Sequence, residues 1–244
     1  MSDLPVVFVV TCEHARPDVP RELDDLGLSR AVLQSHRSFD VGALPVATVL
    51  ARALRVPLHA GRWSRLVADL NRSDDHARVV ARRIDGSPVP GNTGLSAAAR
   101  KARLDRYWRP HRAEVLAAVT AAVRRGLAVH LAVHSFVERL NGIERKNDVG
   151  LLFDPARDRE RALVDRLHAS LSAQQLRVRR NFPYFGDTDA LTTSLRGRFP
   201  VGRYLGIEIE LNQRLSRTAV GQRGLAQALV EAVRASAAPV GTRG

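Results

Sequence analysis

The apolar run GLAVHLAV occupies residues 126–133 and is followed directly by His134 and Ser135. A run of about seven apolar residues entered from a glycine is typical of a strand buried in a sheet. Side chains at the carboxyl end of such a strand point into the crevice where open α/β sheets bind their ligands. This stretch therefore predicts an α/β sheet with His134 at its ligand-binding edge.

A second apolar run has the same relation to a histidine. Residues 6–12, VVFVVTC, lead directly into Glu13 and His14. A lone histidine is more often a buried structural residue, but two histidines at the ends of two strands favour a metal site. We therefore predict a metal-dependent hydrolase in which His14 and His134 are metal ligands.

The third ligand of this site is expected to be a carboxylate, and three candidates stay open. A catalytic zinc ion takes three protein ligands, typically two imidazoles and a carboxylate, and keeps a fourth position open. Glu13 adjoins His14, although neighbouring side chains at a strand end tend to point in opposite directions. Asp18 follows in a proline-bounded loop, and Asp40 precedes an expected helix, where N-capping is its alternative role.

Two carboxylates alternate along an expected strand at residues 204–211. Glu208 and Glu210 lie on the same face of that strand, and burying a charge is costly unless the charge is paired or used. Glu210 is nearer the carboxyl end, so it is the better candidate for a general base that takes a proton from water. An ion pair across strands is the alternative role for both residues.

A candidate substrate anchor lies in the sequence DLNR at residues 69–72, which ends an expected strand at residues 63–71. The planar guanidinium group of Arg72 can hold a substrate carboxylate through two parallel hydrogen bonds, with Asn71 beside it. A surface salt bridge is the alternative role for Arg72.

The composition favours a small anionic substrate over nucleic acid. The chain has 244 residues, a net charge of +13, and arginine at all but two of its 38 basic positions. A groove for nucleic acid combines basic residues with exposed aromatic residues, whereas aromatic residues make up only 5% of this chain. No Gly-x-Ser-x-Gly elbow or phosphate-binding glycine-rich loop is present, and Cys12 ends an apolar strand as core cysteines do. An arginine-rich anion- or nucleic-acid-binding protein stays as the non-enzymatic alternative.

The order of strands and helices predicts one three-layer α/β domain over residues 1–244. Helices are expected at residues 44–54, 159–173 and 218–237, and between residues 96 and 125 with an interruption at Pro110. Residues 181–200 are expected to form an ordered binding loop. The single cysteine, the acidic start and the absence of a run of about 20 apolar residues indicate a cytoplasmic protein without membrane contact. The sequence leaves the oligomeric state open.

Six short motifs, taken in order, resemble the N-formylglutamate amidohydrolase family. They span nearly the whole chain, from Val10 to Arg214. The resemblance implies a zinc-dependent amidohydrolase with a carboxypeptidase-like α/β fold, in which helices flank a mixed sheet. The motifs are TCEHA at residues 11–15, HRSFDVGA at 36–43, DLNR at 69–72, WRPH at 108–111, HSF at 134–136 and EIELNQ at 208–213.

The resemblance also implies a set of metal ligands. His14 and His134 would bind Zn²⁺, and Asp40, which matches the Asp-x-Gly-Ala element of the family, would be the third ligand. The position three residues after the first histidine, where zinc carboxypeptidases have a glutamate, is Pro17 in this chain.

The implied reaction is the hydrolysis of an N-formyl or N-acyl amino acid, with N-formyl-L-glutamate as first choice, as in histidine degradation. Glu210 would be the general base, and Arg72 with Asn71 would hold a substrate carboxylate. A carboxypeptidase or deacylase that acts on small peptides or acyl-amino acids is the enzymatic alternative. Further substrate contacts are expected from Arg145, Thr192 and Arg196.

Overall fold

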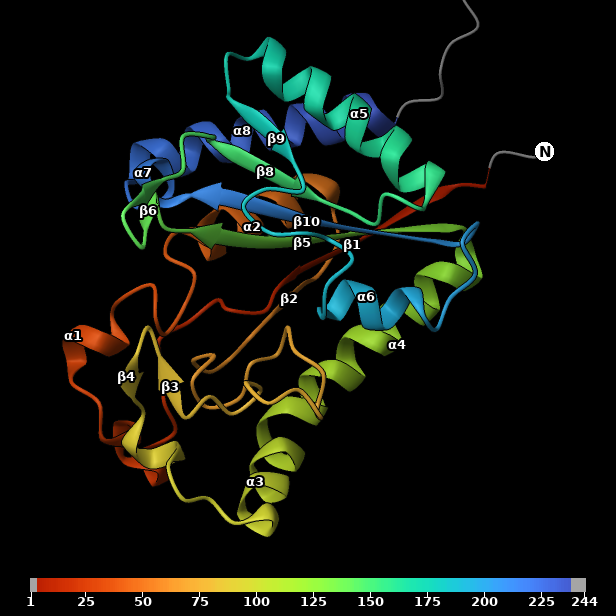
Figure 1. Ribbon diagram of the computed structural model, residues 1–244. Helices are drawn as coiled ribbons and strands as arrows, with labels where there is room; N and C mark the ends of the chain where they lie inside the picture. Colours follow the sequence, from red (N-terminus) through yellow and green to blue (C-terminus); the bar gives the residue numbers. More distant parts are fainter. Residues whose placement is uncertain (1–3, 238–244) are drawn as a thin grey trace, which may run out of the picture.

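A mixed six-stranded sheet organises the computed structural model, which describes residues 4–237 (Figure 1). The strand order is β2-β1-β5-β10-β8-β9, in which β2, β1, β5 and β10 run parallel and β8 is antiparallel to β10. The predicted mixed sheet is therefore confirmed. The strands are β1 (Val6–Cys12), β2 (Leu58–Ala60), β5 (Leu127–Phe136), β8 (Val149–Leu152), β9 (Val178–Arg180) and β10 (Tyr204–Asn212).

Alternate residues of the central strands face opposite sides of the sheet, as the period of two requires. In β5 and β10, the odd-numbered residues Leu131, Val133, Ile207 and Ile209 belong to the largest apolar core. The even-numbered residues, which include His134, Glu208 and Glu210, face the other side and are also buried. The largest core therefore fixes the register that turns these polar side chains toward a single face.

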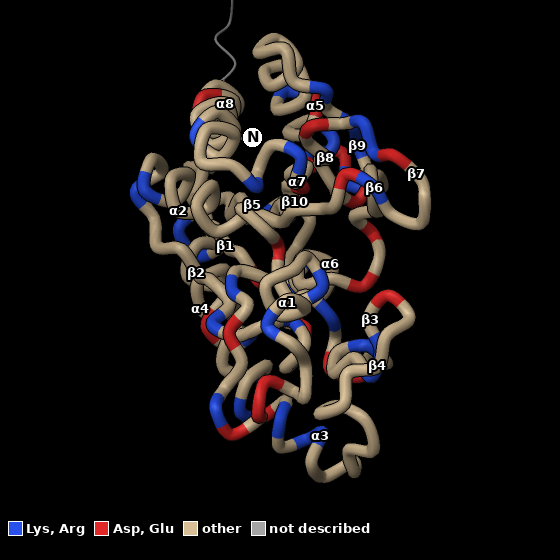
Figure 2. The backbone as a smooth tube through the Cα atoms, turned by 90° about the vertical axis from the view of Figure 1, so that its left-hand side faces the viewer, with Lys and Arg blue, Asp and Glu red and all other residues tan. Residues whose placement is uncertain are grey.

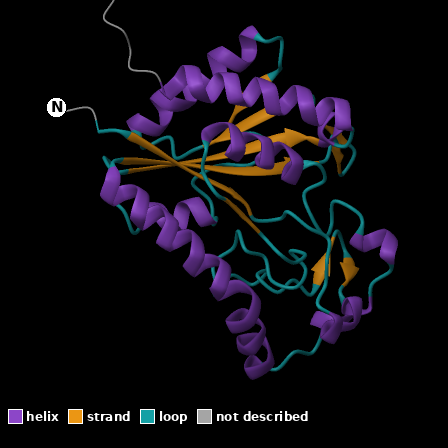
Figure 3. Cartoon of the chain, turned by 180° about the vertical axis from the view of Figure 1, so that it is seen from behind, coloured by secondary structure: helices purple, strands orange, loops and turns teal. Residues whose placement is uncertain are grey.

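Helices cover both faces of the sheet and complete the predicted three layers (Figure 3). One face packs in the largest core against α2 (Ala43–Leu54), α5 (Asp158–Ala173) and α8 (Ala219–Ala237). The other face packs against α4 (Arg109–Arg125) and α6 (Leu191–Arg196). No helix within residues 4–237 is both long and apolar enough to span a membrane.

The long helical segment below the sheet differs from the prediction at Pro110. The α3 helix (Ala97–Arg103), a π-helical turn (Leu104–Trp108) and α4 follow one another without a break. Pro110 lies just after the π-helical turn, at whose end the Arg109 N–H group donates to the Leu104 carbonyl oxygen, and the proline ring cannot donate the next N–H···O bond of the helix. The predicted interruption is therefore a change in helical winding rather than a gap.

Residues 63–71 form turns, so the strand predicted there is wrong. The Ser64 hydroxyl accepts a hydrogen bond from the Leu66 N–H group at 3.1 Å, and the Asp69 carboxylate accepts one from the Asn71 N–H group at 3.0 Å. Such short-range bonds from side chain to backbone compete with strand pairing. The predicted loop at residues 181–200 also contains a helix, α6.

The remaining short elements lie mainly around the loops beyond the sheet edge. They are η1 (Arg21–Gly27), α1 (Arg30–Leu33), β3 (Arg83–Ile84), β4 (Ser87–Pro88), η2 (Pro90–Asn92), β6 (Arg139–Leu140), β7 (Ile143–Glu144) and α7 (Gln213–Ser216).

Basic and acidic residues are mixed over these loops and do not form one basic face in the view of Figure 2. On the long helical segment, Asp105 lies 2.6 Å from both Lys101 and Arg109, and Glu22 lies 2.6 Å from Arg106. Neighbouring acids therefore offset part of the positive charge of this segment. This arrangement gives little support to an extended groove for nucleic acid.

Candidate metal centre and active site

The carboxyl ends of β1, β5 and β10 open into a cavity of about 1220 Å³. The β3–β4 hairpin, below the sheet in Figure 1, lines the same cavity. Parallel strands deliver their carboxyl ends to a common edge, so polar residues far apart in the sequence meet here. The predicted site residues that line this cavity are His14, Asp40, Asn71, Arg72, His134 and Glu210.

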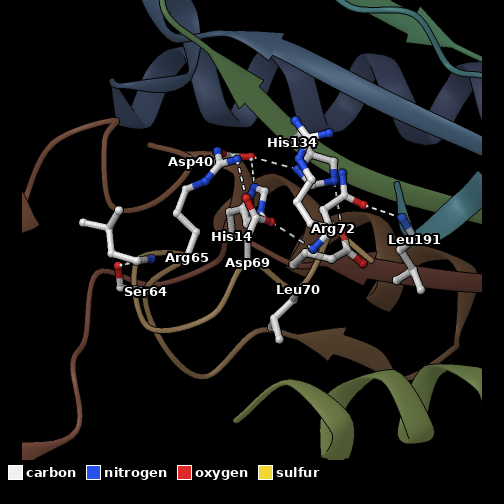
Figure 4. A network of polar contacts seen from close by, with 12 residues as sticks. His14, Asp40, Ser64, Arg65, Asp69, Leu70, Arg72, His134 and Leu191 are labelled. Atoms are coloured by element: carbon white, nitrogen blue, oxygen red, sulfur yellow. Dashed lines mark hydrogen bonds and ion pairs between the residues drawn. The ribbon is translucent and has the colours of Figure 1, made fainter. Parts of the chain in front are cut away.

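Three of these side chains, His14, Asp40 and His134, form a buried cluster (Figure 4). Asp40 Oδ2 lies 2.9 Å from His134 Nδ1 and 3.4 Å from His14 Nδ1. One nitrogen or oxygen atom of each residue lies within 4.8 Å of the other two. The two imidazoles thus meet with a carboxylate between them.

Backbone contacts hold Asp40 in this cluster. The Asp40 N–H group donates to the His14 carbonyl oxygen at 2.8 Å, and the Ser135 N–H group donates to Asp40 Oδ2 at 3.2 Å. The N-cap of α2 is Gly42, whose φ of 79° favours glycine. Asp40 is therefore not the cap of this helix, and its carboxylate faces the two histidines instead.

Each imidazole presents its other nitrogen to a second carboxylate. His14 Nε2 lies 2.7 Å from Asp69 Oδ1, and His134 Nε2 lies 3.0 Å from Glu13 Oε2. Both Nδ1 atoms consequently face Asp40. Burial alone would lower the pKa of His134, but Asp40 and Glu13 raise it well above its usual range. A metal ion that binds Nδ1 must therefore displace a proton.

The residues of the cluster fit a zinc ion. His14 Nδ1 is buried and has no hydrogen-bond partner among residues 4–237, as expected for an atom whose lone pair serves a metal. Two imidazole nitrogens and one carboxylate oxygen are a donor set of catalytic zinc sites. Of the three candidate carboxylates, only Asp40 lies between the histidines. Glu13 contacts the far nitrogen of His134, and Asp18 lines a separate pocket.

Arg65 is a part of the site that the sequence did not reveal. Its guanidinium group donates to Asp69 Oδ2 at 2.9 Å and lies 3.6 Å from Asp40 Oδ1. Burial works against the charge of Arg65, but these two carboxylates raise its pKa above the ordinary value. The only sequence signal is its position four residues before Asp69, within a turn that was predicted as a strand.

Glu210 lies on β10 directly across from His134 on β5. It is buried, and its Oε2 atom has no hydrogen-bond partner among the described residues. Burial raises the pKa of Glu210 to about 8, the nearby Asp40 and Glu208 add to the increase, and His134 opposes it. Such a carboxylate binds a proton readily, which is the property of a general base.

Glu208, on the same face of β10, is fully engaged by protein groups. Its carboxylate accepts hydrogen bonds from the Thr192 hydroxyl at 2.6 Å and from the Asn71 amide at 3.3 Å. The Asn71 carbonyl oxygen accepts from the Leu191 N–H group at 2.8 Å. Glu208 and Asn71 therefore join β10, the DLNR turn and α6 in one network.

Arg72, the predicted substrate anchor, is half-buried in the wall of the cavity (Figure 4). Its guanidinium group donates to the Asp189 carbonyl oxygen at 2.9 Å, and its own carbonyl oxygen accepts from the Trp108 indole at 3.0 Å. Within residues 4–237, no carboxylate forms an ion pair with it. Its charge can thus serve a substrate carboxylate, in contrast to the salt-bridge alternative.

The other three predicted substrate contacts do not line the cavity. Arg145 stacks over the rings of Phe136 and Tyr184, which do line it, with 5.9 and 5.4 Å between the guanidinium carbon and the ring centroids. Thr192 is fully buried against Glu208. Arg196 is 6% exposed and forms an ion pair with Glu160 of α5. Arg145 and Thr192 therefore contact residues of the cavity wall without lining the cavity themselves.

Replacing Arg196 with methionine is expected to lower the free energy of unfolding by about 3–5 kcal/mol, measured by urea denaturation. Arg196 Nε lies 3.0 Å from Glu160 Oε1, and Glu160 is completely buried. Without the guanidinium group, a buried carboxylate would lose its ion-pair partner. The control is Arg161→Met, which breaks an exposed pair with Asp158 and should cost at most about 1 kcal/mol. Equal losses in the two variants would contradict the prediction.

Comparisons with known proteins show the family of the chain. The sequence model of the family described as N-formylglutamate amidohydrolase matches residues 6–216. A crystal structure of a gene product from Agrobacterium tumefaciens is similar at 31% identity and a TM-score of 0.82, covering 94% of this chain and 89% of that one.

The fold is also similar to that of an N-formylglutamate amidohydrolase from Ralstonia eutropha JMP134. Here the identity is 22% and the TM-score 0.66, with 96% of this chain and 93% of that one covered. No protein with a curated description matches the chain. The match to the family model covers most of the sequence and all six motifs. The chain belongs to the N-formylglutamate amidohydrolase family.

Proposed function

We propose that the protein is a zinc-dependent hydrolase of N-acyl amino acids, with N-formyl-L-glutamate as the first-choice substrate. The observation that carries the proposal is the convergence of His14, Asp40 and His134 beside Glu210 in one cavity. His14, Asp40 and His134 would hold the zinc ion. Membership of the family supports cleavage of an amide bond.

When bound, a zinc ion supplies positive charge that acidifies water and polarises a carbonyl group. Glu210 takes one proton from the attacking water, whose oxygen forms a bond to the carbonyl carbon. Glu210 then gives this proton to the nitrogen as the C–N bond breaks. N-formyl-L-glutamate and water thereby yield formate and glutamate, and no covalent bond to the protein is formed.

An arginine in the cavity wall without an ion-pair partner among the described residues favours an anionic substrate. Arg72, which has no carboxylate partner among residues 4–237, would hold a carboxylate of the substrate through its planar guanidinium group. Asn71 would support Arg72 by fixing the turn against Glu208 and α6. The other arginines that line the cavity are largely offset by its acids, which are Asp40, Asp75, Asp85, Asp189, Glu208 and Glu210.

The size of the cavity favours a second candidate, an enzyme that releases larger acyl groups or amino acids from small peptides. Its volume of about 1220 Å³ exceeds the roughly 300–1,000 Å³ of typical small-molecule sites. A formyl-amino acid would leave part of this space to solvent. The same metal centre would serve both substrates.

A substrate panel with metal analysis tests the proposal. The purified protein is assayed on N-formyl-L-glutamate, N-acetyl-L-glutamate and an acidic dipeptide, before and after removal of metal by a chelator and after addition of Zn²⁺. We expect hydrolysis that is lost on chelation and restored by zinc. Hydrolysis that chelation leaves unchanged, or no hydrolysis of any member, would refute it.

Replacing Arg72 with alanine is expected to raise KM for N-formyl-L-glutamate by about 10–100-fold, with a smaller change in kcat. A hydrogen bond to a charged group contributes about 1.5–3 kcal/mol, and Arg72 would make such bonds to bound substrate. Steady-state kinetics measure the effect, and Arg223→Ala on the exposed side of α8 is the control. An unchanged KM for Arg72→Ala would exclude the anchoring role.

A further inference from the structure

Glu13 is a completely buried carboxylate to which the proposed chemistry gives no task. It follows β1 directly and precedes His14 in the chain. The Gly61 N–H group donates to the Cys12 carbonyl oxygen at 2.9 Å, and a Cβ atom on Gly61 would lie only 1.9 Å from the Glu13 carbonyl oxygen. The backbone of Glu13 is therefore held firmly between β1 and the segment after β2.

The carboxylate of Glu13 has one charged neighbour among the described residues, His134. Glu13 Oε2 lies 3.0 Å from His134 Nε2, although the N–H direction is bent away from a linear hydrogen bond. No hydrogen bond within residues 4–237 reaches either Glu13 oxygen, so the His134 imidazole is an ion-pair partner only. Burying a carboxylate is costly without such a partner, so the burial of an ionised Glu13 depends on His134.

The two nitrogens of His134 consequently face two different carboxylates. Nδ1 lies 2.9 Å from Asp40 in the metal cluster, whereas Nε2 faces Glu13 on the far side of the ring. An ionised carboxylate accepts hydrogen bonds and donates none. When a cation occupies the space between Nδ1 and Asp40, the single proton of the neutral imidazole would lie on Nε2, where the Glu13 carboxylate can accept it.

We propose that Glu13 is a positioning residue that fixes the tautomer and the orientation of His134, so that Nδ1 is the atom that binds the metal. The inference rests on the proposed metal-dependent function. Metal-binding histidines commonly donate their second N–H group to a carboxylate, and loss of this partner weakens metal binding by about 10–100-fold.

The corresponding partner of His14 is less exclusive. His14 Nε2 contacts Asp69, but the Asp69 carboxylate also accepts a hydrogen bond from Arg65 at 2.9 Å. No arginine forms an ion pair with Glu13 among the described residues, and His134 is its ion-pair partner there. We therefore expect His134 to depend strongly on Glu13 for its ligand geometry.

The test compares Glu13→Leu, which removes the acceptor, with Glu13→Gln, whose carbonyl oxygen can still accept from Nε2–H. Zinc affinity is measured by competition with a chelator. The tautomer of His134 is read from ¹H–¹⁵N correlations of ¹⁵N-histidine protein loaded with Zn²⁺. We expect Glu13→Leu to bind zinc about 10–100-fold more weakly, and Glu13→Gln to retain the Nε2–H tautomer with a smaller loss.

Glu114→Gln is the matched control, because Glu114 pairs with His59 at 2.6 Å outside the cavity and is largely exposed. It should leave the zinc affinity unchanged. If Glu13→Leu does not fold, the Nε2–H signal of Glu13→Gln and its zinc affinity test the inference. Zinc affinity within threefold of wild type in both Glu13 variants, or metal bound at Nε2 in the wild type, would overturn it. A wild-type protein that binds no zinc would instead overturn the proposed function.

Discussion

Replacing His134 with alanine is expected to abolish stoichiometric zinc binding and to lower kcat/KM by at least about 10³-fold. The variant would keep only His14 and Asp40, whereas a catalytic zinc site needs three protein ligands. Asp40 and Glu13 would also lose the imidazole that lies 2.9 and 3.0 Å from their carboxylates. Elemental analysis and the hydrolysis assay measure the two effects.

His59→Ala is the control for this variant, because His59 also contacts a carboxylate, Glu114, but lies outside the cavity. It should keep both zinc and activity. The more conservative His134→Gln separates loss of the ligand from loss of packing, and circular dichroism checks that each variant is folded. Full activity of a folded, zinc-free His134→Ala protein would show that the metal has no role in the reaction.

Replacing Glu210 with glutamine is expected to lower kcat by about 10²–10⁴-fold while zinc stays bound. Glutamine keeps the shape of the side chain but cannot accept a proton from water. Glu210 lies beside His134 on the neighbouring strand, and its Oε2 has no hydrogen-bond partner within residues 4–237. The substitution therefore breaks few contacts within the protein. Steady-state kinetics and metal analysis of the same preparation measure the result.

The pH dependence of the wild type gives a second measure of the role of Glu210. Because burial raises the pKa of Glu210 to about 8 when no cation is present, a bound divalent cation should lower it. Hydrolysis should then decline as the pH falls below the pKa of the zinc-loaded protein, since a protonated Glu210 cannot act as a base. The control is Glu231→Gln on an exposed position of α8, which should not alter kcat. A Glu210→Gln variant with wild-type kcat would refute the general-base role.

Much of the fold was predictable because it depends on local patterns. The apolar run before His134 forms a fully buried strand, and the alternation in β10 turns Glu208 and Glu210 to one face, as expected. Since parallel strands end at a common edge, His14 and His134 were also expected to meet. Their ring centroids lie 5.1 Å apart.

Other features were mispredicted because side-chain hydrogen bonds, to nearby backbone or to distant segments, outweigh the apolar pattern. The turn at residues 63–71 is apolar enough for a strand, but the Ser64 and Asp69 side chains bond to the nearby backbone. Thr192 and Arg196 are polar residues in a segment predicted as a binding loop. They lie on α6 instead and pair with carboxylates of β10 and α5.

The sequence by itself determined the layered α/β architecture, the family and the edge at which the histidines gather, because strand burial and strand direction follow from residue patterns along the chain. The resemblance already favoured Asp40 over Glu13 and Asp18, but only the tertiary structure shows its carboxylate between the two histidines and gives each imidazole its second carboxylate. Asp40 and His134 are separated by 94 residues, and His14 and Asp69 by 55. Contacts across such separations depend on how whole segments pack, which no local pattern encodes.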